Sequence, residues 1–121
     1  MGSRLYHVAV DSRDPQRLAR FWAEALGYRV LFEDDEEVGI GMDEHTYPGV
    51  VFLPVPEEKA GKNRLHFDLA PDDQEVEVAR LLALGAQRAD VGQGPDVRWV
   101  VLADPEGNEF CVLRPKRSLS G

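Results

Sequence analysis

The sequence predicts an α+β protein built from two tandem βαβββ modules, whose curved mixed sheets surround a shared cavity. The segment LYHVAV at 5–10 is echoed by RLHFDL at 64–69, and each copy precedes an amphipathic helix that ends at a glycine. Three strand-like stretches follow each helix. A half of roughly 60 residues buries too little apolar surface to be robust alone, so each sheet needs a cover for its second face.

The chain is short enough to form a single domain, 1–121. We expect the first module at 1–58 and the second at 62–117. The stretch PEEKAGKN at 56–63 is polar and contains glycine, which is typical of a joint between modules.

The first helix is predicted within 14–27. Asp14 can cap the free N–H groups at its start, and Pro15 suits the first helical position because it has no N–H to satisfy. Gly27 can end the helix in a left-handed conformation. Apolar residues recur along one face at helical spacing: Leu18, Phe21, Trp22, Ala25 and Leu26.

The second helix is predicted within 72–85. Asp72 or Asp73 serves as its cap, and Gly85 is its stop. Its inward-facing residues are predicted to be Val78, Leu81 and Leu82. The two helices therefore follow their first strands at nearly the same spacing.

The remaining elements are short strands separated by turn-forming residues. The predicted strands are 28–33, 37–42 and 49–55 in the first module, and 86–91, 97–104 and 109–115 in the second. The predicted turns are 34–35, 47–49, 92–95 and 105–108. The order βαβββ therefore occurs twice.

A candidate metal centre follows from overlaying the two copies at an offset of 59. The overlay pairs His7 with His66 and Val50 with Glu109. If the modules are related by approximate two-fold symmetry, these four positions converge on one point in the cavity. Three of the four side chains can ligate a metal ion.

Two imidazoles and one carboxylate leave open coordination positions, where a substrate can replace water. The set is associated with non-haem iron and is also used by Mn, Ni, Co or Zn, so the sequence predicts a divalent metal without distinguishing among these. Glu109 opens an otherwise apolar strand. A carboxylate buried there is costly unless it faces a cation, which explains its presence.

A substrate pocket is expected beside this centre. The residues predicted to line it are Val50, Phe52, Trp99 and Cys111. For the two aromatic residues and for Cys111 the alternative is an ordinary core role. Asp68, two residues after His66, either orients that imidazole or lies at the surface.

Composition excludes several classes of partner. The formal net charge of −8 repels phosphate backbones and anionic lipid, so neither nucleic acid nor a membrane surface is an expected partner. No run approaches the roughly 18 consecutive apolar residues of a membrane helix. Cys111 is the single cysteine, and MGSRLYHVAV lacks the features of a secretory signal, so we expect a cytoplasmic protein.

The sequence resembles the vicinal oxygen chelate superfamily, specifically its small glyoxalase-like and bleomycin-resistance-like members. The matching segments are HVAV at 7–10, FWAEALGY at 21–28, LHFDLAPDD at 65–73 and VLADPEGNEFCVL at 101–113. The resemblance covers essentially the whole chain. It implies paired βαβββ modules, usually a homodimer, and a divalent metal held by His7, His66 and Glu109.

The resemblance implies a metal-dependent enzyme in which the ion chelates and polarises a small oxygen-rich substrate, as a lyase, isomerase, transferase or dioxygenase. Glu109, or hydroxide on the metal, is the candidate catalytic base. Lactoylglutathione lyase activity is not expected, because glyoxalase I adds a fourth ligand where this chain has Val50 or a close neighbour. The alternatives are a non-catalytic protein that binds a drug or metabolite, and a metal-dependent dioxygenase.

Overall fold

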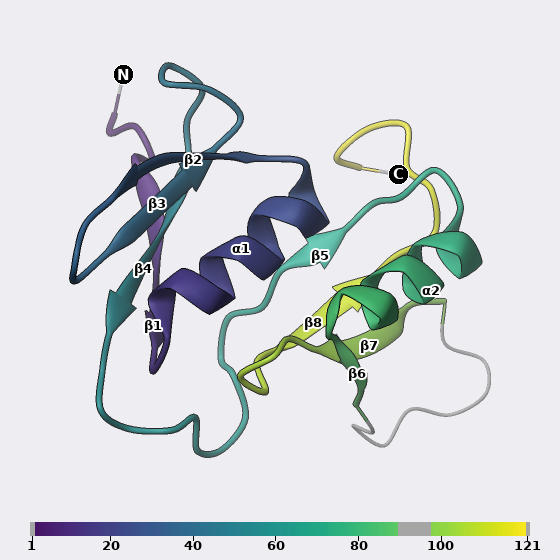
Figure 1. Ribbon diagram of the computed structural model, residues 1–121. Helices are drawn as coiled ribbons and strands as arrows, with labels where there is room; N and C mark the ends of the chain where they lie inside the picture. Colours follow the sequence, from purple (N-terminus) through teal and green to yellow (C-terminus); the bar gives the residue numbers. More distant parts are fainter. Residues whose placement is uncertain (1, 90–97, 121) are drawn as a thin grey trace. The chain divides into compact units, whose positions relative to one another are not determined.

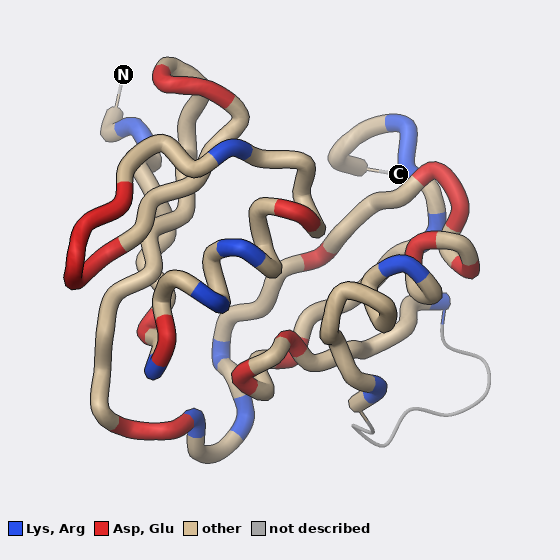
Figure 2. The backbone as a smooth tube through the Cα atoms, in the orientation of Figure 1, with Lys and Arg blue, Asp and Glu red and all other residues tan. Residues whose placement is uncertain are grey.

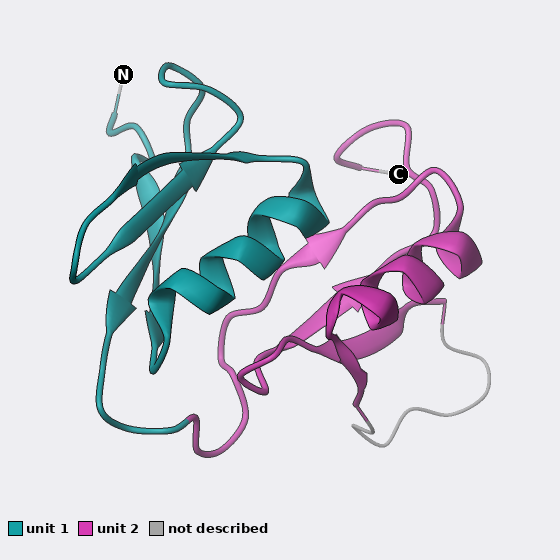
Figure 3. Cartoon of the chain, in the orientation of Figure 1, with its two compact units in different colours: residues 1–58 teal, residues 59–121 magenta. Residues whose placement is uncertain are grey.

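The computed structural model describes residues 2–89 and 98–120, and the chain divides into two compact units at 58/59 (Figures 1 and 3). Each unit holds one helix and one four-stranded mixed sheet, which confirms the predicted α+β class. The predicted turn at 92–95 lies outside the described residues, as do parts of the strands expected at 86–91 and 97–104. Within the described ranges, no helix is long and apolar enough to cross a membrane.

Unit 1 contains the first βαβββ repeat. Its elements are β1 (His7–Ser12), α1 (Pro15–Leu26), β2 (Arg29–Glu33), β3 (Val38–Gly41) and β4 (Gly49–Pro54). The sheet order is β1-β4-β3-β2. Strands β1 and β4 are parallel and the other pairs are antiparallel.

Unit 2 repeats this arrangement. Its elements are β5 (Asp68–Leu69), α2 (Gln74–Leu84), β6 (Gln87–Arg88), β7 (Val100–Ala103) and β8 (Glu109–Val112). The sheet order β5-β8-β7-β6 is that of unit 1, element for element, again with a parallel pair between the first and last strands. The internal repeat seen in the sequence is therefore a repeat of topology.

The two helices begin and end where their capping residues predict. The Asp14 side chain accepts a hydrogen bond from the Arg17 N–H at 3.2 Å, and Asp73, rather than Asp72, accepts one from Val76 at 3.0 Å. Gly27 follows α1 with φ of 68°, a left-handed conformation that glycine adopts without a steric penalty.

The core of unit 1 lies between α1 and one face of its sheet. The helix residues Leu18 and Trp22 are buried, and so are the sheet residues Ile40 and Phe52. Burial of side chains this large supplies most of the favourable free energy of folding. The amphipathic stripe predicted from the sequence is therefore the packing face of α1.

Acidic residues gather in the turn between β2 and β3 (Figure 2). The Asp34 carboxylate accepts hydrogen bonds from the N–H groups of Glu36 at 2.8 Å and Glu37 at 2.9 Å. These bonds hold the pKa of Asp34 below its usual value, with the Glu37 bond the larger cause. The turn predicted at 34–35 is confirmed, and its aspartate stabilises it through the backbone.

Strand β5 is shorter than the segment 64–69 that the sequence predicts. Pairing with β8 begins where the Cys111 N–H donates to the Phe67 carbonyl oxygen at 2.9 Å. The N–H of Asn63 instead donates to the Glu109 side chain, so the chain before Phe67 leaves the backbone ladder. His66 therefore lies two residues before β5 rather than within a strand.

Candidate functional site

His7 is the first residue of β1, on the sheet face opposite α1. Along this strand His7, Ala9 and Asp11 are exposed, whereas Val8 and Val10 are partly buried. Side chains alternate between the faces of a strand, so the exposed set shares one face. The imidazole lies beside the Tyr6 ring, with centroids 4.8 Å apart.

The strand register shows that Val50 does not share a face with His7. In the parallel pair of β1 and β4, His7 is opposite Gly49 and Val8 is opposite Val50. Val50 is only 8% exposed, and it faces α1 as Val8 does. Phe52 is fully buried on the same side, in the core of unit 1.

The sequence overlay of Glu109 on Val50 is therefore wrong by one residue. Gly49 follows its partner His7 by 42 residues, whereas Cys111 follows its partner Asp68 by 43. When the two histidines are matched, Glu109 corresponds to Gly49, which has no side chain to offer. The error arises because an overlay at one fixed offset cannot account for a one-residue difference in strand pairing between the units.

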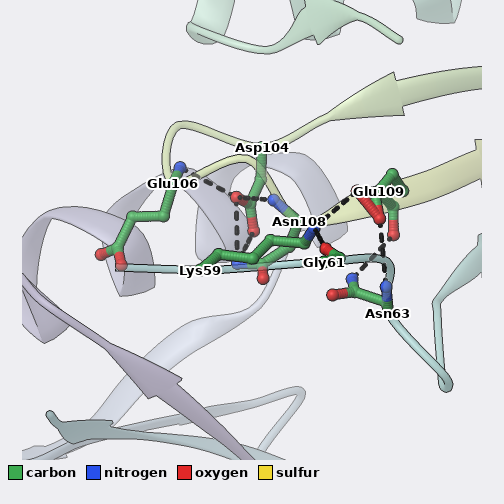
Figure 4. A network of polar contacts seen from close by, with 7 residues as sticks. All are labelled: Lys59, Gly61, Asn63, Asp104, Glu106, Asn108 and Glu109. Carbon is green, nitrogen blue, oxygen red and sulfur yellow. Dashed lines mark hydrogen bonds and ion pairs between the residues drawn. The ribbon is translucent and has the colours of Figure 1, made fainter. Parts of the chain in front are cut away.

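Glu109 begins β8, and both of its carboxylate oxygens have partners within unit 2 (Figure 4). Lys59 Nζ lies 2.9 Å from Oε2, and the Asn63 N–H donates to Oε1 at 3.2 Å. The Lys59 ammonium also donates to the Gly61 carbonyl oxygen. About four fifths of the Lys59 and Glu109 side chains is shielded, with 19% and 20% exposed.

These contacts set the protonation state of Glu109. Burial raises the pKa of the carboxyl group, but the hydrogen bonds from Lys59 and the Asn63 N–H outweigh it, so the pKa lies below its ordinary value. Glu109 is therefore ionised at neutral pH, the form that ligates metal ions. Its low proton affinity makes it a weak general base while Lys59 is bound.

A buried aspartate fixes the turn that precedes Glu109. Asp104 is 3% exposed and accepts hydrogen bonds from the N–H of Glu106 at 2.9 Å and the N–H of Asn108 at 3.0 Å (Figure 4). The Asn108 amide also donates to both Asp104 oxygens. This network sets where β8 begins and thereby where Glu109 enters the sheet.

His66 is oriented by Asp68, one of the two roles that the sequence leaves open for that residue. The His66 Nδ1 atom lies 3.0 Å from Asp68 Oδ1. A metal-binding histidine usually gives its other ring N–H to a carboxylate or carbonyl, which fixes the tautomer. With Nδ1 directed at Asp68, Nε2 is the ring atom that can ligate an ion.

Cys111 lies close to this pair. The ligand atoms of His66, Asp68 and Cys111 are all within 4.8 Å of one another, and Cys111 is half-buried. Burial raises the pKa of the Cys111 thiol, and the Asp68 charge and hydrogen bond raise it further. The thiol is therefore protonated at neutral pH as the structure stands.

Trp99 is exposed and lies one residue before β7. Val101 and Ala103 pair with Cys111 and Glu109 across the sheet, whereas residue 99 lies in a bend before the strand. Cys111, predicted to line a pocket, therefore shares a sheet face with Glu109, and Trp99, predicted to line the same pocket, lies outside the strand.

Six of the residues that matter to the site lie in unit 2: His66 with Asp68 and Cys111, and Glu109 with its partners Lys59 and Asn63. His7 belongs to unit 1, and its place in a common metal centre stays a prediction. Sequence reasoning missed Lys59 and Asn63, which were assigned to a joint between modules. No spacing rule pairs a loop lysine with a strand carboxylate 50 residues later, so the sequence contains no signal for that contact.

Comparison with known proteins gives a family model and two curated relatives. The model of the glyoxalase-like domain matches residues 7–113. The protein CFP32 of Mycobacterium tuberculosis, whose name marks it as a candidate glyoxylase, is 38% identical over 95 residues, as is its Mycobacterium bovis counterpart. The match covers 77% of this chain and 32% of each relative, so the chain spans about a third of their length.

Solved structures share the fold across nearly the whole chain. A glyoxalase/bleomycin resistance protein/dioxygenase family enzyme from Burkholderia phytofirmans has a TM-score of 0.72 at 20% identity, covering 94% of this chain and all of that one. The fosfomycin resistance protein FosX of Mesorhizobium loti also gives 0.72, at 18% identity, with coverages of 99% and 96%. A bleomycin resistance determinant encoded on transposon Tn5 gives 0.62 at 18% identity, with coverages of 95% and 100%.

Proposed function

Because the chain belongs to the glyoxalase-like domain family of the vicinal oxygen chelate superfamily, we propose that it is a metal-dependent enzyme. In this proposal His7, His66 and Glu109 would hold a divalent ion, which a small oxygen-rich substrate would chelate and which would polarise that substrate. When bound, the ion supplies Lewis-acid chemistry at a substrate oxygen. The reaction catalysed is one other than that of lactoylglutathione lyase.

The contact between His66 and Asp68 is the observation that carries this proposal. At 3.0 Å, Asp68 engages Nδ1 and holds the imidazole with Nε2 free to accept a ligand. Such a carboxylate partner is a regular feature of metal-binding histidines and raises their basicity.

The donor set suits a divalent ion. Glu109 is ionised and already attracts a cation, the Lys59 ammonium at 2.9 Å. The Lys59 ammonium would compete with an ion for Glu109, and once displaced it would be available to an anionic oxygen of the substrate. His7 adds a second imidazole of the type that such ions prefer.

The register of unit 1 supports an activity distinct from lactoylglutathione lyase. The position that corresponds to Glu109 is Gly49, so unit 1 contributes no carboxylate there. Proton transfer between two flanking carboxylates, one from each module, would therefore lack its second carboxylate at this position of unit 1. Glu109 is the proposed base, and it would act once Lys59 no longer holds its carboxylate.

The test is elemental analysis of the purified protein and its variants. We expect one equivalent of divalent metal in the wild type, and its loss in His7→Ala, His66→Ala and Glu109→Gln. His45→Ala is the matched control, because His45 is an exposed histidine that takes no part in the proposed set. Metal content unchanged in any of the three ligand variants contradicts the proposed set.

The ion pair of Lys59 and Glu109 favours a second candidate function. The Lys59 ammonium neutralises the Glu109 carboxylate without a metal. This suits a non-catalytic protein that binds a drug or metabolite. The bleomycin resistance determinant from transposon Tn5 shares this fold. In that case metal-free protein binds an aromatic, oxygen-rich ligand with an affinity that chelators do not change. Calorimetric titration with and without a chelator separates this candidate from the enzyme.

A further inference from the structure

Unit 2 places a sulfur donor beside the imidazole and carboxylate described above. His66 Nδ1 lies 3.0 Å from Asp68 Oδ1, and Cys111 completes a triangle of ligand atoms within 4.8 Å of one another. From this arrangement we infer that His66, Asp68 and Cys111 form a thiolate-containing site for a soft or borderline divalent cation such as Zn²⁺ or Cd²⁺.

The backbone holds the three side chains on neighbouring segments. Asp68 and Cys111 are direct partners in the parallel pair of β5 and β8, so their side chains leave the sheet on the same face. His66 lies two residues before Asp68 and reaches the same point from the segment before β5. The site is thus contained in one unit and is held by the register of a single strand pair.

The spacing of the donors suits tetrahedral coordination. Zinc–sulfur and zinc–nitrogen bonds of roughly 2.3 and 2.0 Å place tetrahedral ligands about 3.5 Å apart. The widest separation here is at most 4.8 Å, so side-chain rotation has to close it by roughly an ångström. The half-exposed His66 and Asp68 have the freedom to rotate, since 46% and 48% of their side chains is exposed.

The donor chemistry predicts which ions bind. One thiolate, one imidazole and one carboxylate favour Zn²⁺, Co²⁺ and Cd²⁺ over Mg²⁺ and Ca²⁺, which prefer oxygen ligands alone. On binding, the Cys111 S–H bond breaks, the sulfur forms a bond to the ion, and the proton goes to solvent. Three protein ligands leave the fourth position of a tetrahedral site for water or another small ligand.

The thiolate-containing site goes beyond the proposed function. It shares only His66 with the proposed catalytic centre. It requires Asp68 and Cys111, whereas the proposed catalytic centre requires His7 and Glu109. One ion at a time uses His66 as a ligand. The two sites therefore differ in the variants that abolish them.

Titration of the reduced, full-length protein with Co²⁺ tests the inference. Binding through Cys111 produces a thiolate-to-cobalt charge-transfer band in the near ultraviolet, which His7→Ala and Glu109→Gln retain. Cys111→Ser abolishes the band, and Asp68→Asn weakens Co²⁺ binding by roughly tenfold or more. Co²⁺ binding without the band, no Co²⁺ binding, or a band that persists in Cys111→Ser overturns the inference.

A second measurement needs no substitution at the site. Bound Zn²⁺ should slow alkylation of Cys111 in the wild type, and to the same extent in Glu109→Gln. Equal alkylation rates with and without Zn²⁺ contradict the inference. Failure of the proposed function is recognised separately in Cys111→Ser, which lacks the thiolate site, as metal retention there that does not depend on His7 and Glu109.

Discussion

Glu109 and Lys59 show how one ion pair controls what unit 2 can bind. The ammonium lies 2.9 Å from the carboxylate, and both side chains are largely shielded from solvent. Shielding strengthens the pair relative to one in bulk water. Any divalent ion that uses Glu109 has to compete with this built-in cation.

Replacing Lys59 by Met should therefore tighten binding of Mn²⁺ or Zn²⁺ at Glu109. We expect roughly a fivefold gain in affinity, corresponding to about 1 kcal/mol for the lost competing pair. Isothermal titration of wild type and variant measures it. Lys62→Met is the matched control, because Lys62 is an exposed lysine in the same segment. An equal gain in both variants would assign the effect to general surface charge.

At the scale of helices, local signals sufficed for prediction. Asp14 and Asp73 cap α1 and α2, and Gly27 and Gly85 end them, as the residue types indicate. Each signal acts within a few residues of the element it delimits. The apolar stripe of α1 likewise follows from the helical period alone.

Strand register could not be predicted in the same way. The one-residue difference between the units is visible only in the strand pairing, where Gly49 follows its partner His7 by 42 residues and Cys111 follows Asp68 by 43. Each pairing joins strands that are far apart in the sequence, so no local pattern reports its register. A fixed offset therefore placed Val50, rather than Gly49, at the position of Glu109.

The corrected register predicts where a new carboxylate is tolerated in β4. Val50→Glu buries a charge beneath α1 without a partner, which should cost about 3 kcal/mol or more of unfolding free energy. Leu53→Glu, on the opposite face and only partly buried, should cost less than half as much. Urea unfolding of both variants measures the difference. Equal losses would mean that Val50 does not face the helix.

At the scale of the whole molecule, the two units share an architecture but carry different side chains at the candidate site. Both units have the same strand order, yet Glu109 has a glycine as its counterpart in unit 1. Each unit must also cover a sheet face that its own helix leaves open. Apolar side chains remain exposed in both units: Leu5, Tyr6, Phe32, Leu65 and Trp99.

These exposed side chains lead us to expect a homodimer in solution, the state that the family resemblance implies. Sedimentation equilibrium should give a mass near twice the 13.5 kDa of the chain. Leu65 is 86% exposed and lies next to His66. Its substitution is therefore the most direct test of whether the dimer covers the site. Leu65→Asp should weaken the dimer by about tenfold or more, since burial of a leucine contributes roughly 1.5–3 kcal/mol. Leu119→Asp, near the C-terminus, is the control, and a monomeric mass for the wild type at all concentrations would contradict the prediction.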